Sequence, residues 1–560
     1  MIRPLLLAAT LLAPAAASAQ GQAGPYLAAR IAGYSNDYAA AAEYYGRLLR
    51  SDDAPVQALE NAVIIYSILG DFDRAAQTAA TLEDTGQGSQ FGKSAQMIAA
   101  LLENDLDDAT LLLDTGGVGG ALLDGLLRGW IAVEDGEMAR AIEAFETLAE
   151  TDGFSQFAHL HRAYALALAG DFESADEILS GRAHGPLNLT TRGIAAHAEI
   201  LAQLGRMEDA AELLGEANAV TNSPELQDMA RRIENDGALA WDFLSSARDG
   251  MAESYFTLAA ILAGETSTTF TLLNARAATA LRPDHVDATI LVGELLEMQE
   301  QYDLADAALR AVPRDDPSFF GAEIARSEVL MASGREEAAV EVLQALTRAY
   351  PNERAVWTAQ GDVLRRLDRF EGAADAYDRA IQLIEEVESR DWFLFYARGI
   401  GYERTDRWEQ AEADFRRALE LNPDQPLVLN YLGYGLVEKR IKLDEALDMI
   451  ERAVAARPDD GYITDSLAWV LYRLGRYEEA VEPMERAAQL LPLDPIINDH
   501  LGDILWTVGR EREAEFQWRR ALSLEPEPED EVRIRRKLDV GLDAVLEEEG
   551  GAGSIEAAQD

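Results

Sequence analysis

This sequence has no cysteine and few positively charged residues, and each of these features excludes some classes of protein. There is no cysteine, which excludes disulfide bonds and the attachment of a lipid to a cysteine that follows a leader. The 49 lysine and arginine residues face 100 aspartate and glutamate residues, so the formal net charge is −51. Such a surface repels phosphate backbones and anionic lipid heads, and we therefore expect no nucleic-acid binding and no membrane insertion.

Residues that commonly carry catalysis or bind metals are also few. Of the six histidines, His159 and His161 lie two residues apart, which places them on different faces of a helix. The spacings Gly-x-Ser-x-Gly and His-Glu-x-x-His do not occur. We expect no catalytic residue, no cofactor and no metal site. The alternative, an enzyme or glycan-processing protein, requires carboxylates with shifted pKa values to converge in one pocket from distant parts of the chain.

The first nineteen residues have the three parts of a secretory signal peptide. Arg3 supplies the positive charge, Leu5–Leu12 the apolar core, and residues 17–19 the small side chains before the cleavage site. The apolar core is shorter than the roughly twenty residues that span a bilayer. We expect cleavage before Gln20 and a periplasmic protein, with peripheral association with the outer membrane as an option. The alternative is an uncleaved helix buried in the fold.

One pattern of small, large and turn-forming residues returns after about thirty-four residues. Its members in one unit are Leu467, Ala468, Leu471, Gly475, Ala480, Met484, Ala487 and Pro492, and in the next Leu501, Gly502, Leu505, Gly509, Ala514, Trp518, Ala521 and Pro526. Small residues let two antiparallel helices approach closely, while large ones fill the space beside the crossing. Gly475 and Gly509 mark the turn within each pair, because glycine accepts the left-handed conformation that ends many helices. Such pairs bury their apolar faces only by stacking, so we expect an all-α chain.

The spacing of this repeat along the chain also indicates where its domains begin and end. We expect a signal peptide at 1–19, a degenerate amino-terminal array at 20–224, an irregular helical joint at 225–251, a regular carboxy-terminal array at 252–527, a capping helix at 528–546 and a disordered acidic tail at 547–560. The joint is expected because Asn235, Asp236 and Gly237 end a helix and the apolar residues 241–244 do not complete a standard pair. In the unit that begins at Arg354, the second helix should continue through Val387.

On these residues the chain resembles the tetratricopeptide repeat family. The resemblance implies an α-solenoid superhelix of stacked helix-turn-helix repeats, with a concave groove that binds proteins. In that family, fixed positions of the first helix of each repeat point into the groove. Here those positions hold Phe393, Tyr396, Asn430, Tyr431, Tyr434, Tyr462, Asp465, Trp469, Tyr472, Arg473, Asp499, His500, Asp503 and Trp506. Aromatic anchors beside polar groups dominate protein recognition, although each side chain could instead pack between neighbouring first helices.

The aspartates in this set favour a partner that is a protein or extended peptide segment, basic or neutral in charge. We therefore predict a periplasmic, non-enzymatic scaffold or adaptor that binds protein segments in its concave groove. The alternative among binding proteins is a structural scaffold for envelope assembly that acts through its convex face.

The last third is also similar to the repeats of bacterial envelope adaptor proteins, some of which deliver substrates to carboxy-terminal processing proteases. This resemblance covers residues 392–524 and rests on three stretches: Leu429 to Tyr434, Asp465 to Tyr472, and Asn498 to Asp503. It implies an envelope protease or an assembly complex as the partner. Members that carry a lipid do so on a cysteine, which this chain does not have.

Overall fold

The computed structural model describes residues 23–50, 54–221, 223–265 and 267–550. The expected signal peptide and the last ten residues of the expected tail lie outside these ranges. The described residues form α-helices, one short 3-10 helix, turns and irregular stretches, without any strand. The all-α solenoid is thus confirmed. Within the described ranges, each helix is too short or too polar to cross a bilayer.

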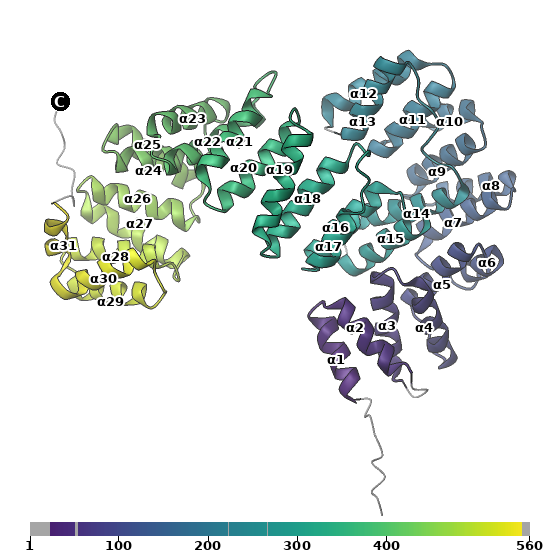
Figure 1. Ribbon diagram of the computed structural model, residues 1–560, viewed down its shortest axis with the longest axis horizontal. Helices are drawn as coiled ribbons and strands as arrows, with labels where there is room; N and C mark the ends of the chain where they lie inside the picture. The colour runs from purple at the N-terminus through teal and green to yellow at the C-terminus, as the bar shows by residue number, and fades with distance from the viewer. Residues whose placement is uncertain (1–22, 51–53, 222, 266, 551–560) are drawn as a thin grey trace, which may run out of the picture. The chain divides into compact units, whose positions relative to one another are not determined.

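The chain divides into two compact units, residues 1–339 and 340–560, and the division falls within one helix. The helices of unit 1 are α1 Ala23–Tyr34, α2 Tyr38–Leu48, α3 Val56–Ile68, α4 Phe72–Asp84, α5 Gln90–Glu103, α6 Leu106–Asp114, α7 Ala121–Glu134, α8 Met138–Ala149, α9 Ser155–Leu168, α10 Phe172–Leu179, α11 Thr191–Gln203, α12 Met207–Val220, α13 Pro224–Asp236, α14 Ala247–Leu262, α15 Thr268–Leu281, α16 Val286–Met298, α17 Tyr302–Leu309, α18 Phe319–Ala332 and the start of α19 Glu336–Ala349 (Figure 1).

Unit 2 continues the helix pairs from the rest of α19. Its helices are α20 Arg354–Arg366, α21 Phe370–Gln382, the 3-10 helix η1 Ser389–Asp391, α22 Trp392–Arg404, α23 Trp408–Leu421, α24 Pro426–Glu438, α25 Leu443–Ala456, α26 Gly461–Arg473, α27 Tyr477–Leu490, α28 Pro495–Thr507, α29 Glu511–Leu522, α30 Pro528–Val540 and α31 Leu542–Glu548 (Figure 1).

The small residues of the repeat lie where two helices of a pair cross. Ala468, Ala480 and Ala514 are fully buried. A Cβ added at Gly502 would lie 2.3 Å from Nε1 of Trp518, so no larger residue fits that crossing. Gly475 takes φ +75° between α26 and α27, the left-handed turn that the sequence predicts. The helix-pair interpretation of the repeat is therefore confirmed in atomic terms.

Two local expectations differ from the structure. The second helix of the unit from Arg354 ends at Gln382, and η1 follows it, so the expected continuation through Val387 is wrong. In place of one helix over 528–546, two helices meet at Gly541, whose φ of +84° interrupts the α-helical course. A Cβ there would also lie 2.7 Å from the ring of Trp506, so glycine is required at that position.

The expected joint at 225–251 lies inside unit 1 and comprises α13, an irregular stretch and the start of α14. Gly237 ends α13 with φ +66°, at the place that the sequence predicts. Whether this joint separates two repeat arrays stays a prediction.

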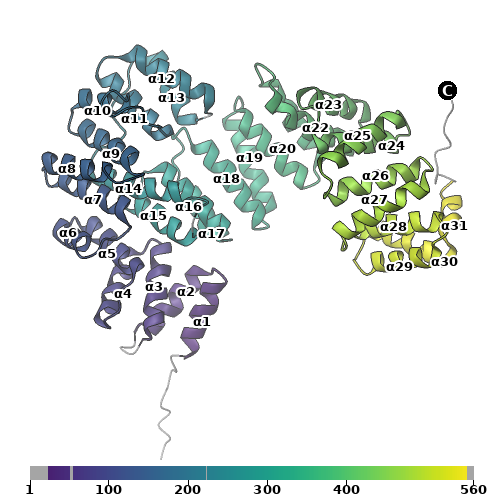
Figure 2. The ribbon, with the colours of Figure 1, turned by 180° about the vertical axis from the view of Figure 1, so that it is seen from behind.

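Beyond the joint, unit 1 folds back on itself. Helix α14 packs against α7 and α9, and α15 packs against α3 and α5, so the first helices of the amino-terminal pairs are covered by a later part of the chain. Figures 1 and 2 show α14 beside α7 from both sides. Arg276 donates a hydrogen bond of 3.0 Å to the carbonyl oxygen of Ile68, and Arg248 one of 3.2 Å to that of Leu102.

At the centre of this contact lies a buried polar chain. Trp130 of α7 donates from Nε1 to Nδ1 of His161 in α9 over 3.0 Å, and Nε2 of His161 lies 3.2 Å from the hydroxyl of Thr257 in α14. Burial lowers the pKa of His161 to about 4, so the ring is neutral and Nδ1 is free to accept. The Trp130 ring occupies the space beside Gly250, where an added Cβ would lie 2.3 Å from it. The amino-terminal face is therefore closed by a specific contact.

Candidate functional site

The residues expected in a groove all lie on α22, α24, α26 and α28, the first helices of successive pairs in unit 2. We call the face formed by these helices the first-helix face. Three of its helices, α24, α26 and α28, begin at side-chain caps: in the last two, Asp460 accepts from the N–H groups of Tyr462 and Ile463, and Asp494 accepts from that of Ile497. These caps fix where each helix starts and therefore which side chains share the face.

Exposure separates the expected residues into three groups. Tyr431 and Tyr462 are exposed, at 40% and 60% of their surface. The half-buried group is Phe393, Asn430, Tyr434, Arg473, His500 and Trp506. The buried group is Tyr396, Asp465, Trp469, Tyr472, Asp499 and Asp503. The aromatic members of the buried group pack against neighbouring helices, as the alternative that sequence reasoning left open expects, and its aspartates form the ion pairs described below.

An aromatic stack joins α26 to α28. The ring of Trp469 lies 4.9 Å from that of Tyr472 and 3.9 Å from that of His500, and both pairs are nearly parallel. His500 also places Nδ1 3.0 Å from a carboxylate oxygen of Asp465. Although burial disfavours the charged imidazole, the carboxylate of Asp465 holds the pKa of His500 above its ordinary value.

A second aromatic group joins α22 to α24. The rings of Tyr396 and Tyr431 meet edge to face at 5.5 Å, and Phe393 lies 6.3 Å from Tyr396. On α24 and α26, Oδ1 of Asn430 and Nε of Arg473 are buried without a hydrogen-bond partner among the described residues. The structure therefore gathers six of the expected residues into two aromatic groups and leaves two polar atoms of the same helices unsatisfied.

The aspartates of α28 have an internal cation that sequence reasoning missed. Lys537 of α30 is buried, and its ammonium group donates to both carboxylate oxygens of Asp499, at 2.8 and 2.7 Å, and to Asp503 at 2.6 Å. Asp503 also accepts from Nε1 of Trp518 at 2.9 Å. Arg533 lies 3.4 Å from the other oxygen of Asp503. Burial and the neighbouring Asp503 raise the pKa of Asp499, against the lowering effect of Lys537.

This pairing changes the charge that the first-helix face presents. Asp465 is paired with His500, and the two aspartates of α28 are paired with the lysine and arginine of α30. Arg473 lies 3.6 Å from Glu438, which also accepts from Trp469 at 3.3 Å. The only sequence signal for Lys537 is its place in the basic stretch from Arg533 to Lys537, in the segment expected to cap the last repeat.

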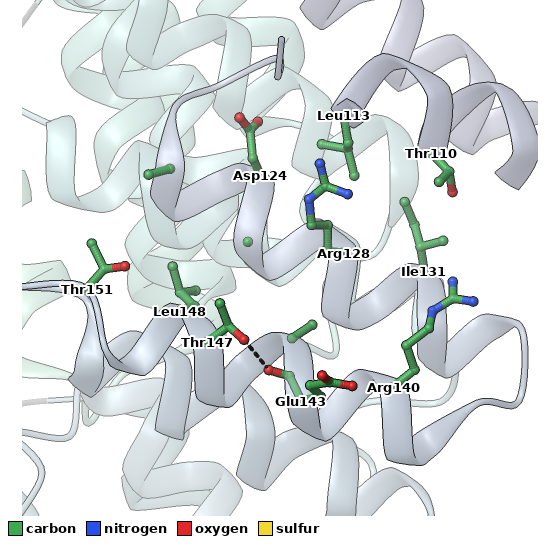
Figure 3. A pocket seen from close by; sticks show the side chains of 13 residues that line it. Thr110, Leu113, Asp124, Arg128, Ile131, Arg140, Glu143, Thr147, Leu148 and Thr151 are labelled. Atoms are coloured by element: carbon green, nitrogen blue, oxygen red, sulfur yellow. Dashed lines mark hydrogen bonds between the residues drawn. The ribbon is translucent and has the colours of Figure 1, made fainter. Parts of the chain in front are cut away.

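A hollow of unit 1 with a volume of about 630 Å³ lies between α6, α7 and α8 (Figure 3). Arg128 is bound to Asp114 at 2.8 Å, and Asp124 accepts from the N–H groups of Val118 and Gly119. Thr147 donates to the carbonyl oxygen of Glu143 at 2.8 Å. Most polar groups of this hollow are thus bound to other groups of the protein. We interpret the hollow as a gap that the short helix α6 leaves unfilled.

Family models described as tetratricopeptide repeat match five stretches of the chain. One model matches residues 26–90, 126–179, 324–386 and 439–495, and a second matches residues 392–425. No matched stretch lies within residues 180–323, which contain the fold-back helices α14 and α15.

Two curated relatives match part of the chain, and one solved structure aligns with most of it. A TPR repeat-containing protein of Pseudomonas aeruginosa is 30% identical over 187 residues, which are 33% of this chain and 31% of that protein. Tetratricopeptide repeat protein 13 of Homo sapiens is 26% identical over 177 residues, which are 31% of this chain and 19% of that protein. The chain therefore spans less than a third of either relative. A crystal structure of the APC/C heterotetramer Cut9–Hcn1 aligns over 94% of this chain and 97% of that chain, at 14% identity and a TM-score of 0.39.

Proposed function

Because the chain belongs to the tetratricopeptide repeat family, whose members bind proteins or peptides, we propose that it is a non-enzymatic scaffold that holds a partner segment on the first-helix face of unit 2. The observation that carries this proposal is the exposure of two large aromatic side chains, Tyr431 and Tyr462, on a face where the other expected residues are buried or half-buried. Tyrosine supplies contact area at low entropic cost and dominates many recognition sites.

The charges on this face favour a neutral segment. The aspartates of α28 are already paired with Lys537, and Asp465 is paired with His500. An acidic partner would meet the carboxylates of this face, and a basic partner would have to compete with Lys537. The unsatisfied atoms Asn430 Oδ1 and Arg473 Nε suit hydrogen bonds to the backbone of an extended segment after a small local rearrangement.

The location that we propose is the periplasm, after cleavage of the signal peptide. The three-part pattern of the first nineteen residues supports it. Within the envelope, the resemblance of residues 392–524 to adaptor repeats supports delivery of a bound segment to a carboxy-terminal processing protease or an assembly complex.

A pull-down from an envelope extract tests this function. The chain starting at Gln20 is compared with the double variant Tyr431→Ala, Tyr462→Ala, whose side chains are exposed and whose loss leaves the core intact. The matched control is Phe516→Ala, because Phe516 is 62% exposed on α29, a second helix of its pair. We expect a partner that the double variant loses and the control retains. Loss in the control alone would instead assign binding to the convex face.

A further inference from the structure

Unit 1 keeps a hollow next to the helix that closes its amino-terminal face. The hollow has a volume of about 540 Å³, within the range of about 300–1,000 Å³ typical of ligand sites. It is bounded by α9, the start of α11, the end of α14, and α16. We call it the apolar hollow, because its walls include Phe157, Leu160, Phe256, Ile290 and Leu291.

A second hollow of about 330 Å³ adjoins the first and has the opposite character. The two share Arg192 and Asp287 in their walls. Eight carboxylate side chains and three arginines line the second hollow, which we call the acidic hollow. An occupant of the apolar hollow therefore lies beside a surface with a large excess of negative charge.

Arg192 separates the two hollows and is unavailable to a ligand. Its guanidinium group donates to the buried carboxylate of Glu253 at 3.1 Å and to Asp287 at 2.6 Å, and it lies 4.9 Å from the ring of Phe243. Because two carboxylates already neutralise it, Arg192 cannot attract an anionic partner. The guanidinium group between the hollows therefore offers no free positive charge to a ligand.

Glu225 supplies a carboxylate that Arg192 offsets only from a distance, without a direct ion pair among the described residues. It lines the acidic hollow and has no hydrogen-bond or ion-pair partner among the described residues. Burial and the neighbouring Asp287 raise its pKa to about 7, against the lowering effect of Arg192. A cation placed beside Glu225 would relieve this repulsion between carboxylates.

We propose that the apolar hollow is a second recognition site, which takes an extended partner segment with apolar side chains in the hollow and a lysine or arginine beside Glu225. Charge complementarity selects this occupant, because the walls next to the hollow are acidic and Arg192 is already paired. A second copy of the chain fits less well, since its net charge of −51 leaves few basic segments to offer. This site lies within unit 1 and is independent of the first-helix face of unit 2.

Three labelled peptides test the proposal by fluorescence anisotropy with the whole chain from Gln20. The first carries two leucines followed by two lysines, the second replaces the lysines with glutamates, and the third replaces the leucines with serines, all with blocked ends. We expect the first peptide to bind at least roughly tenfold more tightly than the second, the effect of one charge-assisted hydrogen bond. We expect the same margin over the third, which loses the burial of two leucine side chains.

Two variants with matched controls locate the site. Ala260→Trp fills the apolar hollow from an exposed position of α14, and Ala211→Trp adds the same bulk at an exposed position of α12. Glu225→Gln removes the unpaired charge, and Glu216→Gln removes an exposed charge outside either hollow. Ala260→Trp should abolish binding of the first peptide and Glu225→Gln should weaken it roughly tenfold, while both controls bind as the native chain does.

Circular dichroism must show equal helix content in all four variants. The proposal is overturned if the first peptide does not bind, if the three peptides bind equally, or if Ala260→Trp binds unchanged. The variant Tyr462→Ala distinguishes this proposal from the proposed function. It should bind the first peptide as the native chain does, even if no partner binds to the first-helix face of unit 2.

Discussion

At the scale of single residues, the lysine at position 537 decides what the end of the first-helix face presents. The sequence places Asp499 and Asp503 four residues apart, on one side of a helix. It does not show that a lysine 34 residues after Asp503 is buried between them, because that burial depends on how α30 docks. The sequence correctly predicted that the two aspartates share a face. It did not predict that their charges are paired inside the protein, because that pairing depends on the packing of α30.

Replacement of this lysine should be costly. In Lys537→Met two buried carboxylates lose their cation, which we expect to destabilise the carboxy-terminal pairs by about 3–5 kcal/mol. The triple variant Asp499→Asn, Asp503→Asn, Lys537→Met removes the charges together and should recover most of that loss. Urea unfolding monitored by hydrogen exchange in α28 and α30 measures both. Equal losses in the single and triple variants would contradict the assigned role of the ion pair.

The pair of His500 and Asp465 predicts a pH dependence. Because the folded-state pKa of His500 is raised, its stabilising contribution is complete below the ordinary value of about 6.5 and is lost as the pH rises through the folded-state pKa. His500→Phe keeps the stacking on Trp469 and removes the charge. The amide protection that this variant loses in α26 and α28 should be larger at pH 5.5 than at pH 8.5. A loss that does not change with pH would count against the ion pair.

At the scale of helices, the pairs were predictable and the fold-back of α14 was not. Periodic small residues and turns identify each pair locally, as Gly475 and Ala480 do between α26 and α27. The contact of α14 with α7 joins residues far apart in the sequence, and its key feature is the absence of a side chain at Gly250. A glycine within a helix costs stability locally, and its reason lies in Trp130, which no local pattern reveals.

Two glycine substitutions test the contact between α14 and α7, and they should change the free energy of unfolding in opposite directions. Gly250→Ala places a Cβ against the Trp130 ring and should destabilise unit 1 by roughly 1–3 kcal/mol, with loss of amide protection in α7 and α14. Gly321→Ala is the control, because nothing lies within 4 Å of its Cβ in α18, and it should stabilise by about 0.5–1 kcal/mol. Thermal unfolding and hydrogen exchange measure both. Stabilisation by Gly250→Ala would show that the contact is loose.

At the scale of the whole molecule, the two units differ in whether other helices cover the first helices of their pairs. In unit 1, α14 and α15 cover the first helices of the amino-terminal pairs. In unit 2, the main contacts are between helices close along the chain, and aromatic side chains stay exposed on the first-helix face. The sequence predicted the family and the solenoid, and the candidate residues it named all lie on first helices of unit 2. It could not predict which face is covered, because that depends on long-range packing.

Site-specific photo-crosslinking tests the central claim, that a partner segment lies on the first-helix face of unit 2. A benzophenone amino acid is placed at Tyr431, at Tyr462 or at Phe516, and each chain is irradiated in an envelope extract. The account predicts one common partner crosslinked from the first two positions and absent from the third, because Phe516 lies on a second helix. Crosslinking of that partner from Phe516 alone, or equally from all three positions, would contradict it.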